Sequence, residues 1–214
     1  MTTPPEAPEG AHRFFGERLP HAEEFARILA DTGVSHGLIG PREVPILWDR
    51  HILNCAVVED AFPRDVRIID VGSGAGLPGI AVAIIRPDLE LHLVEPMQRR
   101  TDWLESTVAA IGLTNVTVHR GRAEDFHGDL SAPFVTARAV ARLDKLARWC
   151  FPLVDDGGTL VAMKGRSAED ELAATTKALR KLGLVSASVS THGHEFSEEA
   201  TLTVDCVVSH RKRR

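Results

Sequence analysis

Tyrosine is absent from this chain of 214 residues, and its absence excludes a hydride-transfer site built on a Tyr-x-x-x-Lys pair. Cysteine is scarce: Cys55, Cys150 and Cys206 lie far apart and form no Cys-x-x-Cys pair, which indicates reduced thiols and no zinc site. No apolar run approaches the roughly 18 residues that a membrane-spanning helix needs. The first residues have neither the basic nor the apolar region of a signal peptide. Together these absences predict a cytoplasmic protein without a metal site.

The composition is that of a globular protein, with 43% hydrophobic and 26% charged residues. The net charge of −5 argues against a protein that coats nucleic acid non-specifically. One face can still be cationic because the basic residues are unevenly placed along the chain. A chain of this length can bury one full core, so we expect one main domain with small appendages. We predict a disordered leader at 1–15, a helical extension at 16–60, the main domain at 61–209 and a basic tail at 210–214.

Four glycines within eight residues form the most informative stretch of the chain, from Asp70 to Gly79 (D-V-G-S-G-A-G-L-P-G). The apolar run 66–71 before them predicts a buried strand, and the apolar pattern 80–85 after them predicts a helix. The stretch contains G-x-G-x-x-G, a weak dinucleotide fingerprint. Its longer form, an acid followed by alternate glycines, resembles motif I of class I S-adenosylmethionine (SAM) methyltransferases. A simple tight turn is a third interpretation, which four glycines disfavour.

Strands and helices alternate through the main domain. Further strands are predicted at 89–94, 116–118, 134–137 and 158–163, with a closing hairpin from 185–190 and 201–209. Helices are predicted at 99–111, 143–150 and 167–182, and upstream of the first strand at 20–32 and 45–60. This alternation predicts an α/β fold with a doubly wound, mostly parallel, seven-stranded Rossmann-like sheet, preceded by a helical extension.

Polar residues gather where the predicted strands end. Glu95 ends the second strand, 25 residues after Asp70, a position that suits hydrogen bonds to ribose hydroxyls. Residues 122–124, Arg138 and Lys164 follow the ends of the next three predicted strands. Ligands of open α/β sheets bind at this edge, so we expect a nucleoside site there. Glu95 alone could also be an ordinary surface glutamate.

Four segments carry a more specific resemblance. They are W-D-R-H-I-L-N at 48–54, D-V-G-S-G-A-G-L-P-G at 70–79, T-A-R-A-V-A at 136–141 and M-K-G at 163–165. In their order and spacing the chain resembles the RsmG (GidB) family, bacterial 16S rRNA guanine-N7 methyltransferases. The segment 34–40 departs from the family pattern, which leaves its part in RNA contact or closure open.

The resemblance implies SAM as cofactor and 16S rRNA, in the small ribosomal subunit, as partner. We expect a monomer. The resemblance also implies methylation of a guanine N7 in the conserved loop of the decoding region. The family's SAM contacts fall on Gly72, Leu77, Ala123, Glu124 and Arg138. The general class I pattern adds Asp70, Gly74 and Glu95.

Guanine N7 has a lone pair and no proton, so its methylation needs no general base and catalysis rests on positioning. Arg138, Lys164 and His51 are therefore candidates for positioning rather than for proton transfer. Candidates for RNA contact are Arg50, His51, Arg100, Lys164 and Arg166. Three of these, Arg100, Lys164 and Arg166, could form a cationic rim with Arg99, Arg122, Arg138 and Arg142, although several are also explained as solvated helix charges. A small-molecule methyltransferase and a SAM-binding ribosome-assembly factor remain alternatives.

Overall fold

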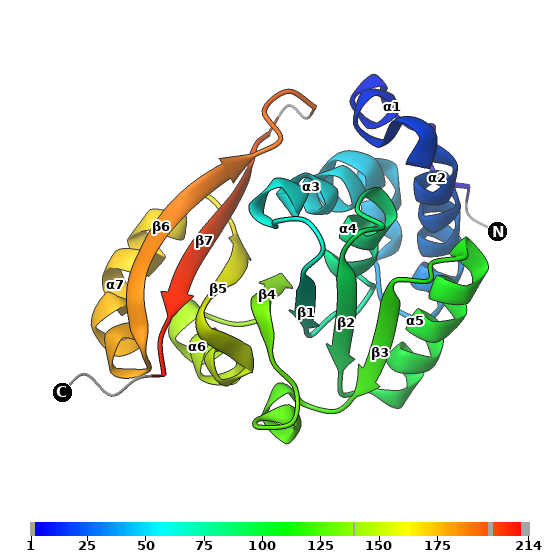
Figure 1. Cartoon of the computed structure of the whole chain (residues 1–214). Helices are drawn as coiled ribbons and strands as arrows, with labels where there is room; N and C mark the ends of the chain where they lie inside the picture. The colour runs from blue at the N-terminus through cyan, green and yellow to red at the C-terminus, as the bar shows by residue number, and fades with distance from the viewer. Residues whose placement is uncertain (1–2, 139, 197–198, 211–214) are drawn as a thin grey trace.

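A seven-stranded sheet forms the centre of the protein in a computed structural model that describes residues 3–138, 140–196 and 199–210. The strand order is β3-β2-β1-β4-β5-β7-β6 (Figure 1). The first five strands pair in parallel, and β7 runs antiparallel between β5 and β6. The strands are β1 (Arg67–Val71), β2 (Glu90–Glu95), β3 (Val116–Arg120), β4 (Ala132–Arg138), β5 (Val154–Lys164), β6 (Leu184–His192) and β7 (Thr201–Val208). The predicted doubly wound sheet is confirmed.

Helices cover both faces of this sheet. In the main domain they are α4 (Gly79–Ile85), α5 (Gln98–Ile111), α6 (Leu143–Cys150) and α7 (Ala168–Lys181). The extension contributes α1 (Glu9–Phe15), α2 (Leu19–Ile28) and α3 (Leu53–Ala56), which lie on the side of α4 and α5, whereas α6 and α7 lie by β5, β6 and β7 (Figure 1). The strand β1 is apolar on both faces because each face is covered: Ile68 faces the core of the extension, and Ile69 faces the core of α6.

The residues predicted to form a disordered leader include a helix. In α1, Ala11 and Phe15 are buried, and the Trp48 Nε1–H donates to the carbonyl oxygen of Pro5 at 3.0 Å. The prediction is wrong for this segment because its apolar residues find partners far along the chain, such as the ring of Phe196 against Phe14. Composition at the start of the chain carries no signal of such contacts.

The second helix of the extension is less regular than its apolar pattern predicts. A 3-10 segment (Pro41–Ile46) and a π-helical turn (Trp48–Ile52) precede α3, and a second 3-10 segment (Val57–Ala61) follows it. Pro45 lacks the N–H that a regular helix would use there. The apolar face is still buried, so hydrophobic periodicity finds the helix but not its local type.

The extension is joined to the closing hairpin by long-range hydrogen bonds. Asn54 Nδ2–H donates to Thr201 Oγ1 at 2.7 Å, and the Thr201 hydroxyl donates to the Asn54 carbonyl at 2.9 Å. His192 Nδ1 lies 2.5 Å from a carboxylate oxygen of Asp60, and its Nε2 lies 2.9 Å from Thr203 Oγ1. These bonds hold residues from the two ends of the chain against each other.

Among the described residues, no helix is both long and apolar enough to cross a membrane. The basic tail predicted at 210–214 lies, except for His210, outside the described residues. The three cysteines are free and buried.

Candidate cofactor site at the carboxyl edge of the sheet

The glycine turn follows β1 at the carboxyl edge of the sheet. Gly72, Gly74 and Gly76 have φ angles of 74°, 51° and 77°, in the left-handed region that favours glycine. The amides of Gly72 and Ser73 both donate to the Val94 carbonyl, at 2.8 and 3.2 Å, which fixes the turn to β2. A Cβ on Gly74 would meet no atom closer than 3.7 Å, so this side of the turn is open to a ligand.

Asp70 lies beneath the turn and is 1% exposed. Its Oδ2 accepts the Gly79 amide at 3.1 Å, at the start of α4, whereas its Oδ1 is buried without a hydrogen-bond partner. Burial raises the pKa of the Asp70 carboxyl from 3.8 to about 7. A Cβ on Gly79 would lie 2.3 Å from Leu93 Cδ2 and 2.7 Å from Asp70 Oδ2, so only glycine allows this close approach of helix to strand.

Glu95 at the end of β2 faces the turn from the neighbouring strand. The residue is 2% exposed, and its oxygens accept the amides of Gly74 at 3.1 Å and Met97 at 3.0 Å. Arg100 lies 3.6 Å from it. A carboxylate has about four acceptor positions, so capacity remains for hydroxyl donors. Glu95 therefore stays a candidate for holding a ribose.

The end of β3 leads into a short 3-10 segment (Ala123–Phe126). Ala123 is buried and Glu124 is exposed, and the segment is fixed by the Arg122 amide donating to Asp125 at 2.8 Å. Leu77 is buried in the core cluster of α4. A contact between Leu77 and a cofactor would therefore involve its backbone or the rim of its side chain.

Arg138, at the end of β4, reaches into the helical extension. Its Nη1 donates to Cys55 Sγ at 2.9 Å, and its Nη2 lies 3.1 Å from the Arg50 carbonyl and 2.9 Å from His51 Nδ1. Burial raises the pKa of the Cys55 thiol to about 11, so the sulfur is a neutral acceptor. His51 Nε2 in turn lies 2.8 Å from Glu43 Oε2. The structure thus joins a strand end of the main domain to two turns of the extension.

Lys164, at the end of β5, is engaged within the protein. Its side chain is 10% exposed, and its Nζ donates to the Ala141 carbonyl and to Glu171 Oε1, both at 2.9 Å. The same Glu171 oxygen accepts the Leu143 amide at the start of α6. These bonds fix the loop between β4 and α6, whose Val140 lies over Gly72. The structure therefore assigns Lys164 a loop-fixing contact and offers no support for an RNA contact.

We expect Lys164→Met to lower the free energy of unfolding by about 2 kcal/mol, because it leaves the partly buried Glu171 carboxylate without its cation. Lys164→Met combined with Glu171→Gln removes that charge and keeps an acceptor for Leu143, so at least half of the loss should be regained. Urea unfolding of the two variants checks this expectation. Equal losses in the single and double variants would contradict it.

The other candidates for RNA contact differ in how accessible they are. Arg166 is 88% exposed beside Glu199, and Arg50 is 69% exposed. Arg100 faces Glu95 instead, and His51 is only 13% exposed with both ring nitrogens engaged. Of the candidates for RNA contact, Arg50 and Arg166 are the most exposed. Each has a carboxylate beside it, Glu43 at 3.8 Å and Glu199 at 2.5 Å, with which an external phosphate would compete.

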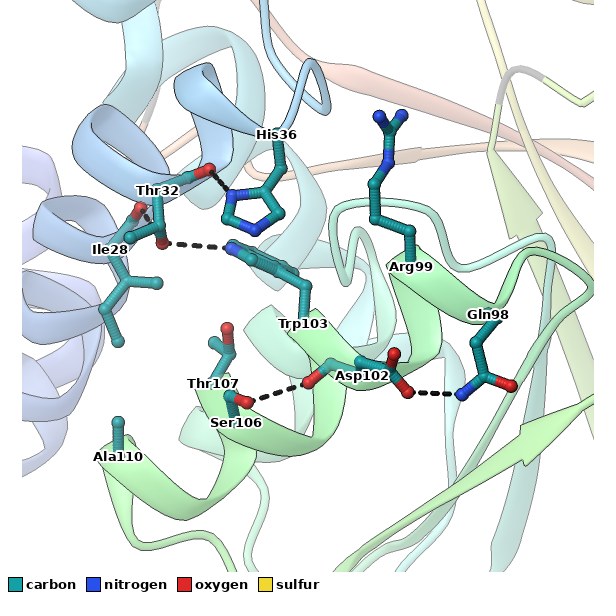
Figure 2. A pocket seen from close by; sticks show the side chains of 10 residues that line it. All are labelled: Ile28, Thr32, His36, Gln98, Arg99, Asp102, Trp103, Ser106, Thr107 and Ala110. Atoms are coloured by element: carbon teal, nitrogen blue, oxygen red, sulfur yellow. Dashed lines mark hydrogen bonds between the residues drawn. The ribbon is translucent and has the colours of Figure 1, made fainter.

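A groove of about 660 Å³ lies between α2, the π-helical turn after it (Leu29–Gly33) and α5. Figure 2 shows His36 and Trp103 in its wall, both anchored to Thr32: Trp103 Nε1–H donates to Thr32 Oγ1 at 2.9 Å, and His36 Nδ1 lies 2.8 Å from the Thr32 carbonyl. Arg99, in the first turn of α5, also lines the groove. The groove is lined by no residue of the glycine turn, and the divergent segment 34–40 reaches it through His36.

Sequence reasoning missed four residues that shape the site: Glu43, Cys55, Val140 and Glu171. Cys55 lies 83 residues before its partner Arg138, and Glu171 approaches Leu143 from another helix. None of these residues stands at a strand end, which was the signal used to select candidates. The packing of the extension and of α7 brings Glu43, Cys55 and Glu171 to the site, whereas Val140 lies in the loop between β4 and α6.

The described residues fit SAM on three independent observations. The turn is open at Gly74, Glu95 has acceptor capacity for ribose hydroxyls, and Arg138 is a cation with no carboxylate within ion-pair distance among the described residues. The fold is similar to that of the solved M. jannaschii TYW2 in complex with AdoMet (TM-score 0.58, 16% identity, 76% of this chain and 77% of that chain). Aeropyrum pernix fibrillarin with bound S-adenosyl-L-methionine is similar too (TM-score 0.53, 19% identity, 73% and 74%). The fold is that of the class I SAM-dependent methyltransferases.

Within this class the family is specific. Residues 18–201 match the GidB family, described as rRNA small subunit methyltransferase G, and the chain belongs to that family. Proteins named "Ribosomal RNA small subunit methyltransferase G" are similar over nearly the whole chain. That of Pseudarthrobacter chlorophenolicus is 50% identical (95% of this chain, 94% of the relative), and that of Paenarthrobacter aurescens is 51% identical (94% and 93%). That of Thermobifida fusca is 56% identical over 77% of this chain and 69% of the relative.

Proposed function

We propose that this chain transfers a methyl group from SAM to N7 of a guanine in the 16S rRNA of the small ribosomal subunit, in the conserved loop of the decoding region. The observation that carries the proposal is the family match across residues 18–201. The names of the relatives indicate the RNA of the small ribosomal subunit as the substrate. Methyl transfer to guanine N7 is the more specific part of the proposal.

Bound SAM would supply an electrophilic methyl group on a sulfonium. Glu95 would accept hydrogen bonds from its ribose, and the turn at Gly72 and Gly74 would receive its amino-acid part. Ala123 and Glu124 would border the adenine, and Arg138 would meet the carboxylate. Asp70 would act from beneath the turn by holding the Gly79 amide.

The state of the titratable side chains favours an acceptor atom that needs no proton removed. His51 has one ring nitrogen facing the Arg138 guanidinium and the other facing Glu43, and the Lys164 amine is bonded to Glu171 and Ala141. Neither group is free to act as a general base. Guanine N7 meets this condition because its lone pair is unprotonated, so the residues need only position it in line with the methyl group.

The first turn of α5, which contains Arg99, is a candidate for contact with the RNA backbone. Arg99 forms no ion pair within the described part of the chain, and it lines the groove. We expect Arg99→Glu to raise the KM for small subunits about fivefold and to reduce its salt dependence, since each lost phosphate contact removes counterion release. Lys181→Glu, at the exposed end of α7, is the matched control. Equal salt dependence in both variants would exclude this contact.

The proposal is tested by incubating the protein and isotopically labelled SAM with small subunits from a strain that lacks this gene. Naked 16S rRNA and assembly intermediates serve as competing substrates, and the modified nucleoside is mapped by digestion and mass spectrometry. We expect a single 7-methylguanosine in the decoding-region loop. Binding of SAM without label in any of these RNAs would move the acceptor to another RNA or to a small molecule.

A further inference from the structure

The imidazole of His51 has a defined proton arrangement because of its two neighbours. A guanidinium has N–H donors and no acceptor, so the 2.9 Å contact with Arg138 requires a lone pair on His51 Nδ1. The proton of the neutral ring is then on Nε2, where it donates to Glu43 Oε2 at 2.8 Å. His51 is therefore the Nε2–H tautomer, and its orientation is set from both sides.

The environment of the ring keeps it neutral. Burial lowers the pKa of His51, and the charge of Arg138 lowers it further, while the bond to Glu43 opposes both effects. A protonated ring would direct an Nδ1–H at the guanidinium and lose the contact. Glu43, by contrast, is 36% exposed and can hold the outer nitrogen without being buried itself.

Arg138 uses only part of its donor capacity in these contacts. Three of its five N–H groups point to Cys55 Sγ, the Arg50 carbonyl and His51 Nδ1. The remaining two have no hydrogen-bond partner within the described residues, and no carboxylate there neutralises the guanidinium. These are Nε–H and one Nη1–H, which point in different directions because both Nη2–H donors are in use. A carboxylate would therefore accept one charge-assisted hydrogen bond from this guanidinium.

We propose that His51 is a positioning residue, which together with Glu43 aligns Arg138 for the carboxylate of the amino-acid part of SAM. The inference rests on the proposed function, because it assumes that SAM is the ligand of the site. It also gives the extension a defined part in cofactor binding: Glu43 and His51 lie in its 3-10 segment and π-helical turn, and Arg138 lies at the end of β4. The Glu43 carboxylate would orient the His51 ring, and the ring would orient the Arg138 guanidinium that meets the ligand.

The experiment compares two ligands that share a nucleoside and a thioether but differ in the amino-acid part, whose carboxylate Arg138 would meet. S-adenosylhomocysteine carries the amino-acid part, whereas 5′-methylthioadenosine has the same nucleoside and thioether without it. In calorimetric titrations we expect His51→Leu to weaken binding of S-adenosylhomocysteine about tenfold and to leave methylthioadenosine within twofold, because only the charge-assisted contact is misaligned. A general disturbance of the extension would weaken both ligands alike.

Conservative and control variants separate positioning from packing. His51→Gln should regain most of the loss, since an amide offers one acceptor to Arg138 and one donor to Glu43. Glu43→Leu should reproduce the His51→Leu effect in weaker form. His36→Leu, on the same extension and bonded within its own turn, should leave both affinities unchanged. An unchanged ratio of the two affinities in His51→Leu, or a loss confined to the KM for RNA, would overturn the inference while leaving the methyltransferase proposal intact. Failure of the wild-type protein to bind either ligand would overturn both.

Discussion

We expect Glu95→Gln to weaken binding of S-adenosylhomocysteine about 100-fold, which corresponds to about 3 kcal/mol. The carboxylate of Glu95 lies 2% exposed between the amides of Gly74 and Met97, and it can accept from ribose hydroxyls at its remaining lone pairs. An amide in its place has one oxygen to accept with and directs N–H groups at one of these donors. The variant therefore loses the ribose contact and loosens the glycine turn together.

Calorimetric titration measures this loss, and Glu105→Gln is the matched control, since Glu105 is exposed on the adjoining helix α5. The methylthioadenosine affinity should fall as far as that of S-adenosylhomocysteine, because both ligands carry the ribose. A loss of less than threefold for either ligand would mean that the nucleoside is held elsewhere.

The second large effect is a pH dependence of stability that comes from Asp70. Burial raises the folded-state pKa of Asp70 to about 7, above the unfolded value of about 3.9. A carboxyl whose pKa is higher in the folded state binds its proton more tightly there. Its contribution to stability is therefore complete below pH 4 and is lost as the pH rises through about 7.

We expect the ligand-free protein to lose about 3 kcal/mol of unfolding free energy between pH 5 and pH 8 through this group. Asp70→Asn should remove this component, because the amide oxygen still accepts the Gly79 amide and the side chain no longer ionises. Urea unfolding at several pH values measures the difference between the two proteins. Parallel pH profiles would show that Asp70 ionises freely, with its buried Oδ1 hydrated.

The sheet and the glycine turn could be predicted from sequence because their signals are local. The strand before Gly72 is a short β-branched run, and the turn residues Gly72, Gly74 and Gly76 occupy left-handed conformations that only their own identity allows at low cost. Glu95 could be selected as a candidate because an acidic residue at the end of a predicted strand is visible in a single local segment of the sequence. The structure places each of these residues at the predicted edge.

The contacts of the candidate side chains could not be predicted in this way. Lys164 resembles an RNA contact by its place at a strand end, yet Glu171 on the following helix holds its amine. His51 resembles an exposed ligand of RNA, yet Arg138 and Glu43 occupy both its nitrogens. Such pairings depend on how helices pack over the sheet, and no periodicity in the sequence reports them. The helix of the leader was missed for the same reason.

The bonds between the extension and the closing hairpin set an order of events during synthesis. Asn54 and Asp60 leave the ribosome long before Thr201 and His192, the residues that they bind. Asn54 and Asp60 are therefore synthesised before their hydrogen-bond partners in the closing hairpin. The bonds of Asn54 and Asp60 to the hairpin therefore form only after residues 192 and 201 have been synthesised.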